Sequence, residues 1–393
     1  MEKWIECKIS DIGTVVGGAT PSTKKPENYE NGDIAWITPK DLSSFSGRYI
    51  QCGERNITEI GLKSCSTQLL PKNTVLFSSR APIGYVAIAE NAVCTNQGFK
   101  SVIPNEDTDP IFLYYLLKYN KDKIESMGSG TTFKEVSGNT MKNIVVSVPQ
   151  DKQVQEKIAS VLDAIDEKIE ENERINNNLE QQAQTLFDNF YDSLSGQSCI
   201  LSEIIDISDG THDSPKATEH GYPLVTSKHL LPFGVDTSSA NIISKADYDK
   251  VNERSKVNTG DILISMIGTV GLISYVIDSP VEFAIKNVGL FKTSKHPSLD
   301  LYILYYLKNK STTQHIEKCL AGSTQKYISL GELRKLPIVV PSPDELAAYN
   351  LVVRPIVSEI ALLMQENRRL SNLRDTLLPK LMSGELDVSG LDI

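Results

Sequence analysis

Two long stretches of the chain carry apolar residues at the three-and-four spacing of a single helix face. In the first stretch, 150–193, polar and charged residues fill the positions between the apolar ones, and neither Gly nor Pro interrupts the run. Its predicted seam consists of Val154, Ile158, Leu162, Ile165, Ile169, Leu179, Ala183 and Leu186. About 40 residues at a rise of about 1.5 Å predict a rod of roughly 60 Å, which needs a partner to cover its apolar face.

The second stretch, 345–382, is the partner that this pattern predicts. Its apolar positions are Ile356, Ile360, Leu363, Leu370, Leu373, Leu377 and Leu381. Asn367 occupies an otherwise apolar seam position, where a lone polar residue commonly fixes the register of a coiled coil. Pro355 predicts a break near Arg354, because proline inside a helix removes a hydrogen bond. The alternative is two separate surface helices that do not meet.

The segments outside these helices contain short β-rich pieces punctuated by Pro and Gly. In the first segment the pattern predicts strands at 33–39, 73–79, 84–89 and 144–148, and a short helix at 110–126. We therefore predict an α+β chain with a first domain (1–149), a central helix (150–194), a second domain (195–342) and a C-terminal helix with its tail (343–393).

The second domain repeats the order of the first. The matched segments are 37–42 with 225–230, 75–78 with 262–265, 96–98 with 287–289, 112–116 with 303–307, and 130–134 with 322–326. This is a tandem duplication of a whole unit, domain followed by helix. Two such copies can fold about an approximate two-fold axis, with the helices antiparallel and one domain at each end.

Composition indicates a folded chain long enough for two domains. Of its 393 residues, 40% are hydrophobic, and no secretory leader or run of eighteen apolar residues is visible, so we expect a cytoplasmic protein that does not span a membrane. The six cysteines lack metal or disulfide spacing and predict free, mostly buried thiols. They are Cys7, Cys52, Cys65, Cys94, Cys199 and Cys319.

The net charge of −10 is unevenly distributed along the chain. The first and second domains are each neutral, whereas 150–195 carries −7 and 343–393 carries −3. A nucleic-acid partner requires Lys and Arg for phosphate contacts. The acidic excess lies on the helices, so the two domains remain able to present basic faces.

Several motifs together resemble the specificity subunit of type I restriction–modification enzymes. The first copy opens with Gly17-Gly18-Ala19-Thr20-Pro21-Ser22, followed by Tyr29 and the segment 32–37, and the second opens with Asp209-Gly210-Thr211-His212-Asp213-Ser214-Pro215. Both copies have a late glycine turn before a strand that ends at Pro149 or Pro341, and the segment 377–386 is also typical of the family. The resemblance covers nearly the whole chain.

The resemblance implies a subunit without catalysis of its own that recognises a bipartite, asymmetric site in double-stranded DNA. It further implies two methyltransferase subunits and additional restriction subunits as partners. S-adenosylmethionine, ATP and magnesium are expected in those partners and no cofactor in this chain. Independently, the sequence shows no Gly-rich phosphate loop, methyltransferase motif or metal-spaced His or Cys cluster. A spacer of roughly 60 Å suits half-sites between one and two turns of B-DNA apart.

Candidate DNA contacts are polar side chains in turns, mostly at positions matched between the repeats, because base edges and phosphates are bound by such groups. They are Lys40, Arg80, Asn96, Gln97, Thr132, Lys134, His212, Lys228, Lys286, Asn287, Thr324 and Lys326. The alternative for each basic residue is a solvated surface charge, and Asn96 and Asn287 could instead cap turns. The lack of His clustering favours a turn or DNA-contact role for His212 over a catalytic or metal role.

Candidate partner contacts lie at the ends of the two helices. Phe187, Phe190 and Tyr191 are unusually apolar for an exposed rod and predict either a partner contact or a place in the domain core, and Leu378 and Leu381 belong to the family-typical C-terminal segment. The tyrosine pairs 114–115 and 305–306 fall in the apolar stripe of a short helix, which favours core packing.

Two other functions are compatible with this pattern. One is the recognition part of a single-chain restriction–methylation enzyme, which would require an upstream methyltransferase domain. The other is a coiled-coil scaffold that joins two protein-binding domains without touching DNA.

Overall fold

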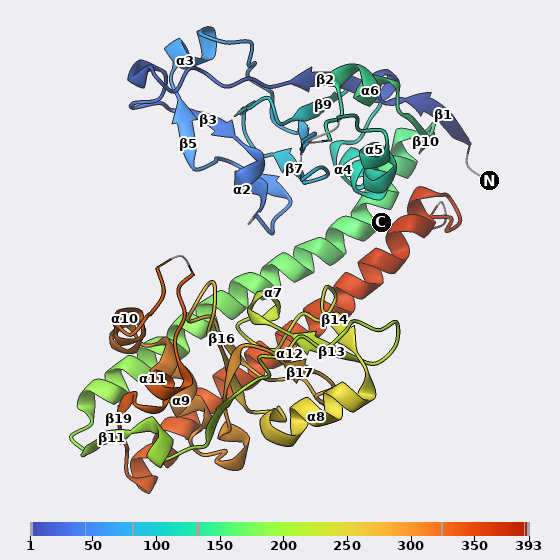
Figure 1. Cartoon of the computed structure of the whole chain (residues 1–393). Coiled ribbons are helices and arrows are strands. Elements are labelled where there is room, and N and C mark those ends of the chain that lie inside the picture. Colours follow the sequence, from blue (N-terminus) through green and yellow to red (C-terminus); the bar gives the residue numbers. More distant parts are fainter. Residues whose placement is uncertain are drawn as a thin grey trace. The chain divides into compact units, whose positions relative to one another are not determined.

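The computed structural model describes residues 3–43, 45–80, 82–130, 134–323, 325–388 and 390 (Figure 1). It divides into two compact units, Met1–Glu171 with Asn367–Ile393, and Asn172–Glu366. Each unit therefore contains one domain of the repeat together with the adjoining parts of both long helices.

The first domain closes on itself through its terminal strands. β1 (Trp4–Lys8) pairs antiparallel with β10 (Val145–Pro149). Between them lies a five-stranded sheet in the order β2 (Gly13–Gly17), β9 (Lys100–Pro104), β6 (Val75–Phe77), β7 (Val86–Ala89) and β4 (Tyr49–Ile50). A three-stranded sheet has the order β5 (Arg55–Ile57), β3 (Ile34–Ile37) and β8 (Cys94–Thr95). The helices are α1 (Ile9–Ile12), α2 (Pro39–Ser43), α3 (Glu59–Lys63), α4 (Pro110–Tyr119), α5 (Lys121–Ser126) and α6 (Gly138–Asn143).

The second domain repeats this topology, except that its larger sheet has four strands among the described residues and contains no equivalent of β4. β11 (Ser198–Ile200) pairs antiparallel with β19 (Pro337–Val339). A four-stranded sheet has the order β12 (Ile207–Asp209), β18 (Val288–Phe291), β15 (Ile262–Ser265) and β16 (Ile273–Tyr275), and a three-stranded sheet has the order β14 (Asn241–Ile243), β13 (Tyr222–Val225) and β17 (Ala284–Ile285). The helices are α8 (Lys245–Ser255), α9 (Asp300–Lys308), α10 (Lys310–Lys318) and α11 (Leu330–Arg334). The internal duplication predicted from the sequence is confirmed.

The two long helices are α7 (Lys152–Ser193) and α12 (Pro343–Met382). In the first unit, Arg374 Nη1 donates to Asp166 Oδ1 at 2.7 Å and Asn367 Nδ2 donates to the Ile169 carbonyl at 3.2 Å. The second of these bonds places Asn367 at the helix interface, as its seam position predicts. Residue numbers rise along α7 as they fall along α12, so the two helices are antiparallel.

The same antiparallel pairing holds in the second unit. Asn172 Nδ2 donates to Glu366 Oε2 at 2.8 Å, and the rings of Phe190 and Tyr349 stack with centroids 4.8 Å apart. The predicted coiled-coil pairing is therefore confirmed, and the alternative of two helices that never meet is excluded.

Three expectations about the helices were wrong. α12 continues through Pro355, where a break near Arg354 was predicted. The carbonyl that loses its partner belongs to Leu351. Pro355 is exposed and residue Leu351 is 79% exposed, so this turn of the helix faces water. Leu373 and Leu186, predicted in the seam, are 48% and 36% exposed. The predicted helix 110–126 is divided at Asn120 into α4 and α5.

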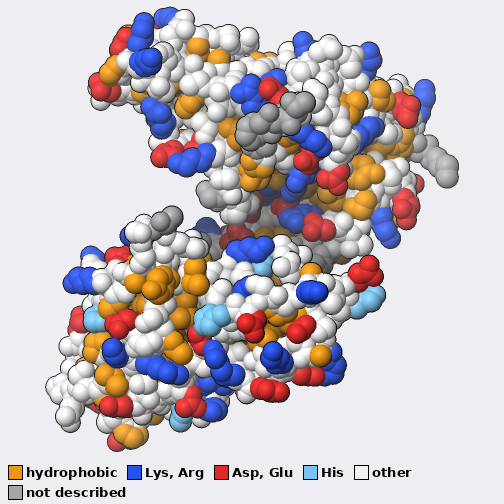
Figure 2. Space-filling model, in the orientation of Figure 1, with side chains coloured by type: hydrophobic (Ala, Val, Ile, Leu, Met, Phe, Trp, Pro, Cys, Tyr) orange, Lys and Arg blue, Asp and Glu red, His pale blue; other side chains and the backbone are white. Residues whose placement is uncertain are grey.

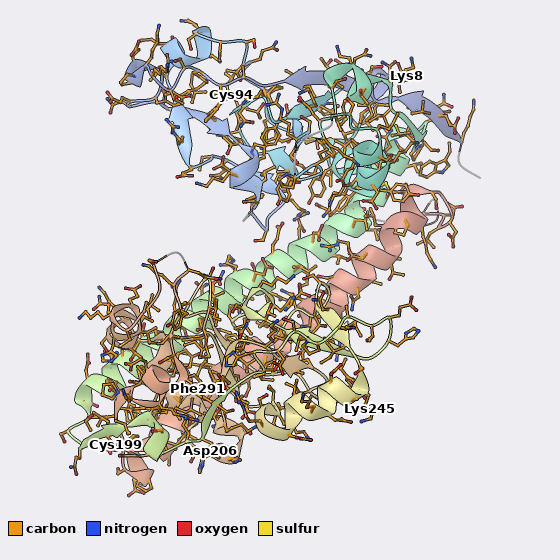
Figure 3. The ribbon with its side chains drawn as sticks, in the orientation of Figure 1. Lys8, Cys94, Cys199, Asp206, Lys245 and Phe291 are labelled. Carbon is orange, nitrogen blue, oxygen red and sulfur yellow. The ribbon has the colours of Figure 1, made fainter. Side chains whose placement is uncertain are left out.

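Each domain core takes in apolar residues of both long helices. In the first unit, Leu162 of α7 and Leu381 of α12 have no exposed surface and pack in one cluster with α4 and β10. In the second unit, Phe187 of α7 and Val353 of α12 pack with Phe291, which lies among the side chains inside the domain (Figure 3). Complete burial of such a side chain contributes about 1.5–3 kcal/mol, so each helix pair is held by its domain.

The tyrosine pairs lie in these cores, as predicted. Tyr114 and Tyr115 of α4, and Tyr305 and Tyr306 of α9, are all buried. Within the described residues, the six cysteines are free, but only Cys94 is buried and Cys52 is exposed, so the expectation of mostly buried thiols was wrong.

α12 is also long and apolar enough to cross a bilayer, by length and composition only, since one window of eighteen residues has a mean hydropathy of 1.5. A third of that window is buried inside the protein. Val353, Val357 and Ile360 of this helix lie in the core of the second unit.

A buried ionic network joins the first domain to α7. Arg48, whose side chain is only 4% exposed, donates to both carboxylate oxygens of Glu170 at 2.9 and 3.0 Å and also pairs with Asp163. Asp166 accepts hydrogen bonds from Tyr115 and Arg374, each at 2.7 Å. Burial and then the Asp166 charge raise the pKa of Tyr115, so its phenol remains protonated and donates to the carboxylate.

We predict that Arg48→Ala destabilises the first unit by about 3 kcal/mol, because it leaves two carboxylates without their buried cation. Both tryptophans of the chain, Trp4 and Trp36, belong to this unit, so tryptophan fluorescence during urea unfolding reports on it alone. Lys63→Ala is the control, since Lys63 pairs with Glu59 while both side chains are about three-quarters exposed. Equal unfolding midpoints for the two variants would contradict the prediction.

Candidate nucleic-acid interface

Backbone hydrogen bonds gather several loops at one region of the first domain. The Ala19 N–H donates to the Thr95 carbonyl at 3.0 Å, which joins the loop after β2 to the end of β8. The Asn96 N–H donates to the Ile37 carbonyl at 3.1 Å, which adds the loop after β3. The loop after β6 joins through Ser79, whose N–H donates to the Gly98 carbonyl at 2.7 Å. The late glycine turn adds a fifth segment, because the Val136 N–H donates to the Ser79 carbonyl at 2.9 Å.

The second domain gathers the same loops with equivalent bonds. The Thr211 N–H donates to the Ile285 carbonyl at 3.0 Å, and the Lys286 N–H donates to the Val225 carbonyl at 2.9 Å. The Ile328 N–H donates to the Met266 carbonyl at 3.0 Å, as Val136 does to Ser79. We call these two equivalent sets of loops the first and second loop clusters. Most of the predicted contact residues lie in them.

These bonds correct one match between the repeats. The sequence pairs Asn96 with Asn287, but the backbone pairs Asn96 with Lys286, because each follows the parallel strand pair and donates to the equivalent carbonyl. Counted forward from these strands, Gln97 corresponds to Asn287, and Gly98 is the extra residue before Phe99, which corresponds to Val288. The turn in the first domain is one residue longer, and identical asparagines in the two turns conceal that difference.

Two glycines permit the close approach of the first loop in each cluster. A Cβ on Gly18 would lie 2.2 Å from the Thr95 carbonyl oxygen, and a Cβ on Gly210 would lie 2.2 Å from the Ile285 carbonyl oxygen. Such distances are far inside van der Waals contact. Glycine is therefore required at both positions for the loop to lie against the strand.

Lys40 and Lys228 occupy equivalent turns. In the first domain, Asp41 Oδ2 accepts from the Thr38 N–H at 2.7 Å, and in the second, His229 Nδ1 accepts from the Thr226 N–H at 2.9 Å. Burial and then the nearby Lys228 charge lower the pKa of His229, which suits a ring nitrogen that accepts. Lys40 itself pairs with Glu54 at 2.7 Å on an exposed surface.

The hairpins after β6 and β15 share a backbone but differ in side chains. Ser78 and Ser265 make the same bonds, each accepting an N–H seven residues on, from Tyr85 and Leu272. Arg80 pairs with Glu135 at 3.0 Å in the first domain. These two residues also form an isolated antiparallel backbone bridge, and the equivalent backbone bridge in the second domain joins Ile267 and Tyr327.

The late glycine turns contain the remaining predicted contacts. Lys134 is exposed beside the Arg80–Glu135 pair, and the Lys326 carbonyl accepts from the Gly268 N–H at 3.3 Å. Thr132 and Thr324 lie outside the described residues.

Three predicted residues of the second domain line one hollow of about 350 Å³, namely Lys228, Lys286 and Asn287. Gly268 and Thr269 of the β15 hairpin form another part of its wall. A second hollow of about 370 Å³ is lined by His212 and by Lys250 and Arg254 of α8. His212 Nδ1 lies 2.8 Å from Asn287 Oδ1, so the two hollows adjoin at this pair.

The visible faces of both domains carry Lys and Arg side chains interspersed with Asp and Glu (Figure 2). Asn96 is engaged within its own turn, since its Oδ1 accepts from the Gly98 N–H at 2.8 Å, as the turn-capping alternative described. Among the described residues, no group of three or more His, Cys, Asp and Glu side chains could hold a metal ion.

The predicted partner contacts lie mostly in domain cores. Phe187 and Leu381 have no exposed surface, so their prediction as partner contacts does not hold. Phe190 and Tyr191 are half-buried and pack against Tyr302, and Leu378 is half-buried against the first core. Of the two interpretations of the aromatic cluster, the structure supports the domain core.

Exposed apolar residues on α12 were missed by the sequence analysis. In the second unit, Leu351 is 79% exposed, Val352 52% and Leu362 60%. Leu351 and Leu362 are eleven residues apart, about three helical turns, so they lie on one side of α12. The sequence did contain a signal for these residues, because they fall on a different side of the predicted helix from the apolar seam.

Comparison with known proteins identifies the family. A model of the type I restriction modification DNA specificity domain matches the chain twice, over residues 1–181 and 200–346. The chain belongs to this family. It is 33% identical over 420 residues to the type I restriction enzyme MjaIX specificity subunit of Methanocaldococcus jannaschii, which covers 99% of this chain and 94% of that protein.

Two further matches agree. The EcoR124I/EcoR124II specificity subunit of Escherichia coli is 30% identical over 164 residues, or 40% of each chain. The crystal structure of a type I restriction–modification S subunit from M. genitalium has a TM-score of 0.58 at 16% identity, covering 97% of this chain and 96% of that one, which shows the same fold.

We predict that Gly210→Ala destabilises the second unit by about 1–3 kcal/mol, because the added methyl group meets a backbone carbonyl that cannot move aside cheaply. Calorimetric unfolding measures the change. Gly331→Ala in α11 is the control, since its nearest neighbour is the Ser329 Oγ at 3.6 Å and alanine favours a helix. A Gly210→Ala variant as stable as the Gly331→Ala variant would contradict the close approach.

Proposed function

We propose that this chain recognises DNA sequence for a type I restriction–modification complex, with one half of a bipartite site contacted by each loop cluster. The observation that carries the proposal is the pair of loop clusters, which share a backbone framework and differ in side chains. Membership of the specificity family argues against the scaffold alternative.

The side chains of the second loop cluster suit this role. Lys228, Lys286 and Asn287 line one hollow, and lysine and amide groups donate to the acceptors that purines present in the major groove. Lysine also binds phosphates, which position a protein on the duplex without reading its sequence. We propose that these three residues contact DNA directly.

The two half-sites should differ in sequence. Where the first cluster presents the charged pair Arg80 and Glu135, the second presents Ile267 and Tyr327. Charged groups bind phosphates or base-edge acceptors, whereas apolar side chains contact the methyl group of thymine. Equivalent positions of the two loop clusters therefore suit different groups on the DNA, as an asymmetric site requires.

We further propose that the chain is non-catalytic, acts in the cytoplasm and does not span a membrane. Two methyltransferase subunits and the restriction subunits would supply the chemistry, with S-adenosylmethionine, ATP and magnesium bound in those partners. We also propose a partner contact on α12, whose apolar side chains Leu351, Val352 and Leu362 are exposed, because covering exposed apolar surface with another protein is favourable.

The direct test is co-expression with the methyltransferase subunits, followed by genome-wide mapping of methylated adenine. A split motif with a constant unspecified spacer is the expected result. Co-purification of the partners without any methylated motif would contradict DNA recognition by this chain.

We predict that Lys228→Ala reduces the slope of log K against log salt for duplex DNA by about 1, since each lost phosphate contact releases about one counterion fewer. Fluorescence anisotropy over a salt series measures the slope. Lys245→Ala is the control, because Lys245 lies on α8 and pairs with Asp249 at 2.7 Å (Figure 3). An unchanged slope for Lys228→Ala would exclude a phosphate contact.

We predict that Leu351→Asp abolishes co-purification of a methyltransferase subunit, because the charge cannot be buried at an apolar interface. Ile60→Asp is the control, since Ile60 is a similarly apolar residue, 59% exposed, on α3 of the first domain. Loss of the partner with both variants, or with neither, would argue against a contact at Leu351.

A further inference from the structure

A threonine and a histidine occupy equivalent positions beside the amide side chains of the two loop clusters. Thr20 follows Ala19, and His212 follows Thr211, and these preceding residues make equivalent bonds to β8 and β17. The corrected match between the repeats makes Gln97 equivalent to Asn287. The four side chains therefore form two equivalent pairs, Thr20 with Gln97 and His212 with Asn287.

Both pairs are in hydrogen-bond contact, although their residue types differ. The Thr20 hydroxyl donates to Gln97 Oε1, and His212 Nδ1 lies 2.8 Å from Asn287 Oδ1. The residue type differs between the repeats at both positions, yet the contact between the two loops is present in both. Because the contact recurs in both domains with different residue types, we attribute it to the shared loop framework and not to the sequence of one turn.

His212 is itself held from the other side. Its Nε2 lies 3.0 Å from Asp209 Oδ2, and Asp209, with a side chain only 7% exposed, is also paired with Arg254 of α8. Both ring nitrogens of His212 thus lie within hydrogen-bond distance of a side-chain oxygen. The ring therefore lies between Asp209 of β12 and the amide of Asn287.

The backbone of Asn287 is also fixed. Its φ of 53° lies in the left-handed region, which side-chain-bearing residues seldom adopt, and its N–H donates to the Thr211 carbonyl at 3.1 Å. Asn287 also lines the hollow that contains Lys228 and Lys286.

We propose that Thr20 and His212 are positioning residues that hold the amides of Gln97 and Asn287 for base-edge recognition. An amide whose oxygen is engaged by the protein presents its NH₂ group, which carries two donors, to the DNA. The matching base edge carries acceptors, such as N7 and O6 of guanine in the major groove. A held amide also avoids the entropy cost of ordering a free side chain on binding.

This inference rests on the proposed function and names the residues that set specificity within it. The test uses the complex of the full chain with its methyltransferase subunits and a pool of duplexes containing a randomised segment, with sequencing of the bound fraction. The variants are Thr20→Val, which has the shape of threonine without the hydroxyl donor, and Thr20→Ser, which restores the donor. Thr23→Val, at an exposed threonine of the same loop, is the matched control.

We expect Thr20→Val to lose about tenfold of the base preference at a single position of one half-site, with the other half-site unchanged. Thr20→Ser should restore the preference, and Gln97→Ala combined with Thr20→Val should lose no more than Gln97→Ala alone. His212→Ala should act in the same way on the other half-site. At the affected position, 7-deazapurine should lower the affinity of the wild type but not that of Thr20→Val.

The outcomes separate the inference from the proposed function. A split motif selected equally well by the wild type and by Thr20→Val overturns the positioning role and leaves DNA recognition in place. A loss of preference with Thr23→Val equal to that with Thr20→Val also overturns it. A wild-type complex that selects no motif at all overturns the proposed function and the inference together.

Discussion

Each domain of this protein is closed by hydrogen bonds between its own first and last strands, and the rest of the architecture depends on that closure. β1 with β10, and β11 with β19, bring the entry and exit of a domain side by side. A long helix begins within a few residues of the second strand in each case. A domain and its helix therefore form one unit that can be duplicated in a single chain without crossing connections.

Burial then couples each closed domain to both helices. Leu162 and Leu381 enter the first core, and Phe187 and Val353 enter the second. The Arg48 network adds polar specificity in the first unit, because its carboxylates are satisfied only when α7 lies in one register against the domain. This rigid support allows the loop clusters to share a backbone while their exposed side chains change, which is how one fold can serve different target sequences.

Periodicity and internal repetition predicted the helices, their pairing and the duplication, because both are properties of the sequence itself.

Features that depend on contacts between distant segments could not be predicted from the sequence. The match of Asn96 with Asn287 was wrong by one residue, since only backbone hydrogen bonds reveal the longer turn. For Phe187 the sequence left a partner contact and the domain core as alternatives, because helical spacing does not show that a neighbouring domain covers the side chain. The break predicted at Pro355 is absent because this turn of α12 faces water. Thr20 was not predicted as a site residue because the side chain that it contacts, Gln97, lies 77 residues away in the sequence.

The central claim is that two equivalent loop clusters each contact their own half of one DNA site. Hydroxyl-radical footprinting of the assembled complex, on a duplex that carries its methylated motif, tests this claim most directly. We predict two protected backbone segments, one over each half-site, separated by an accessible spacer. Protection of a single half-site, or of no segment at all, would contradict the account.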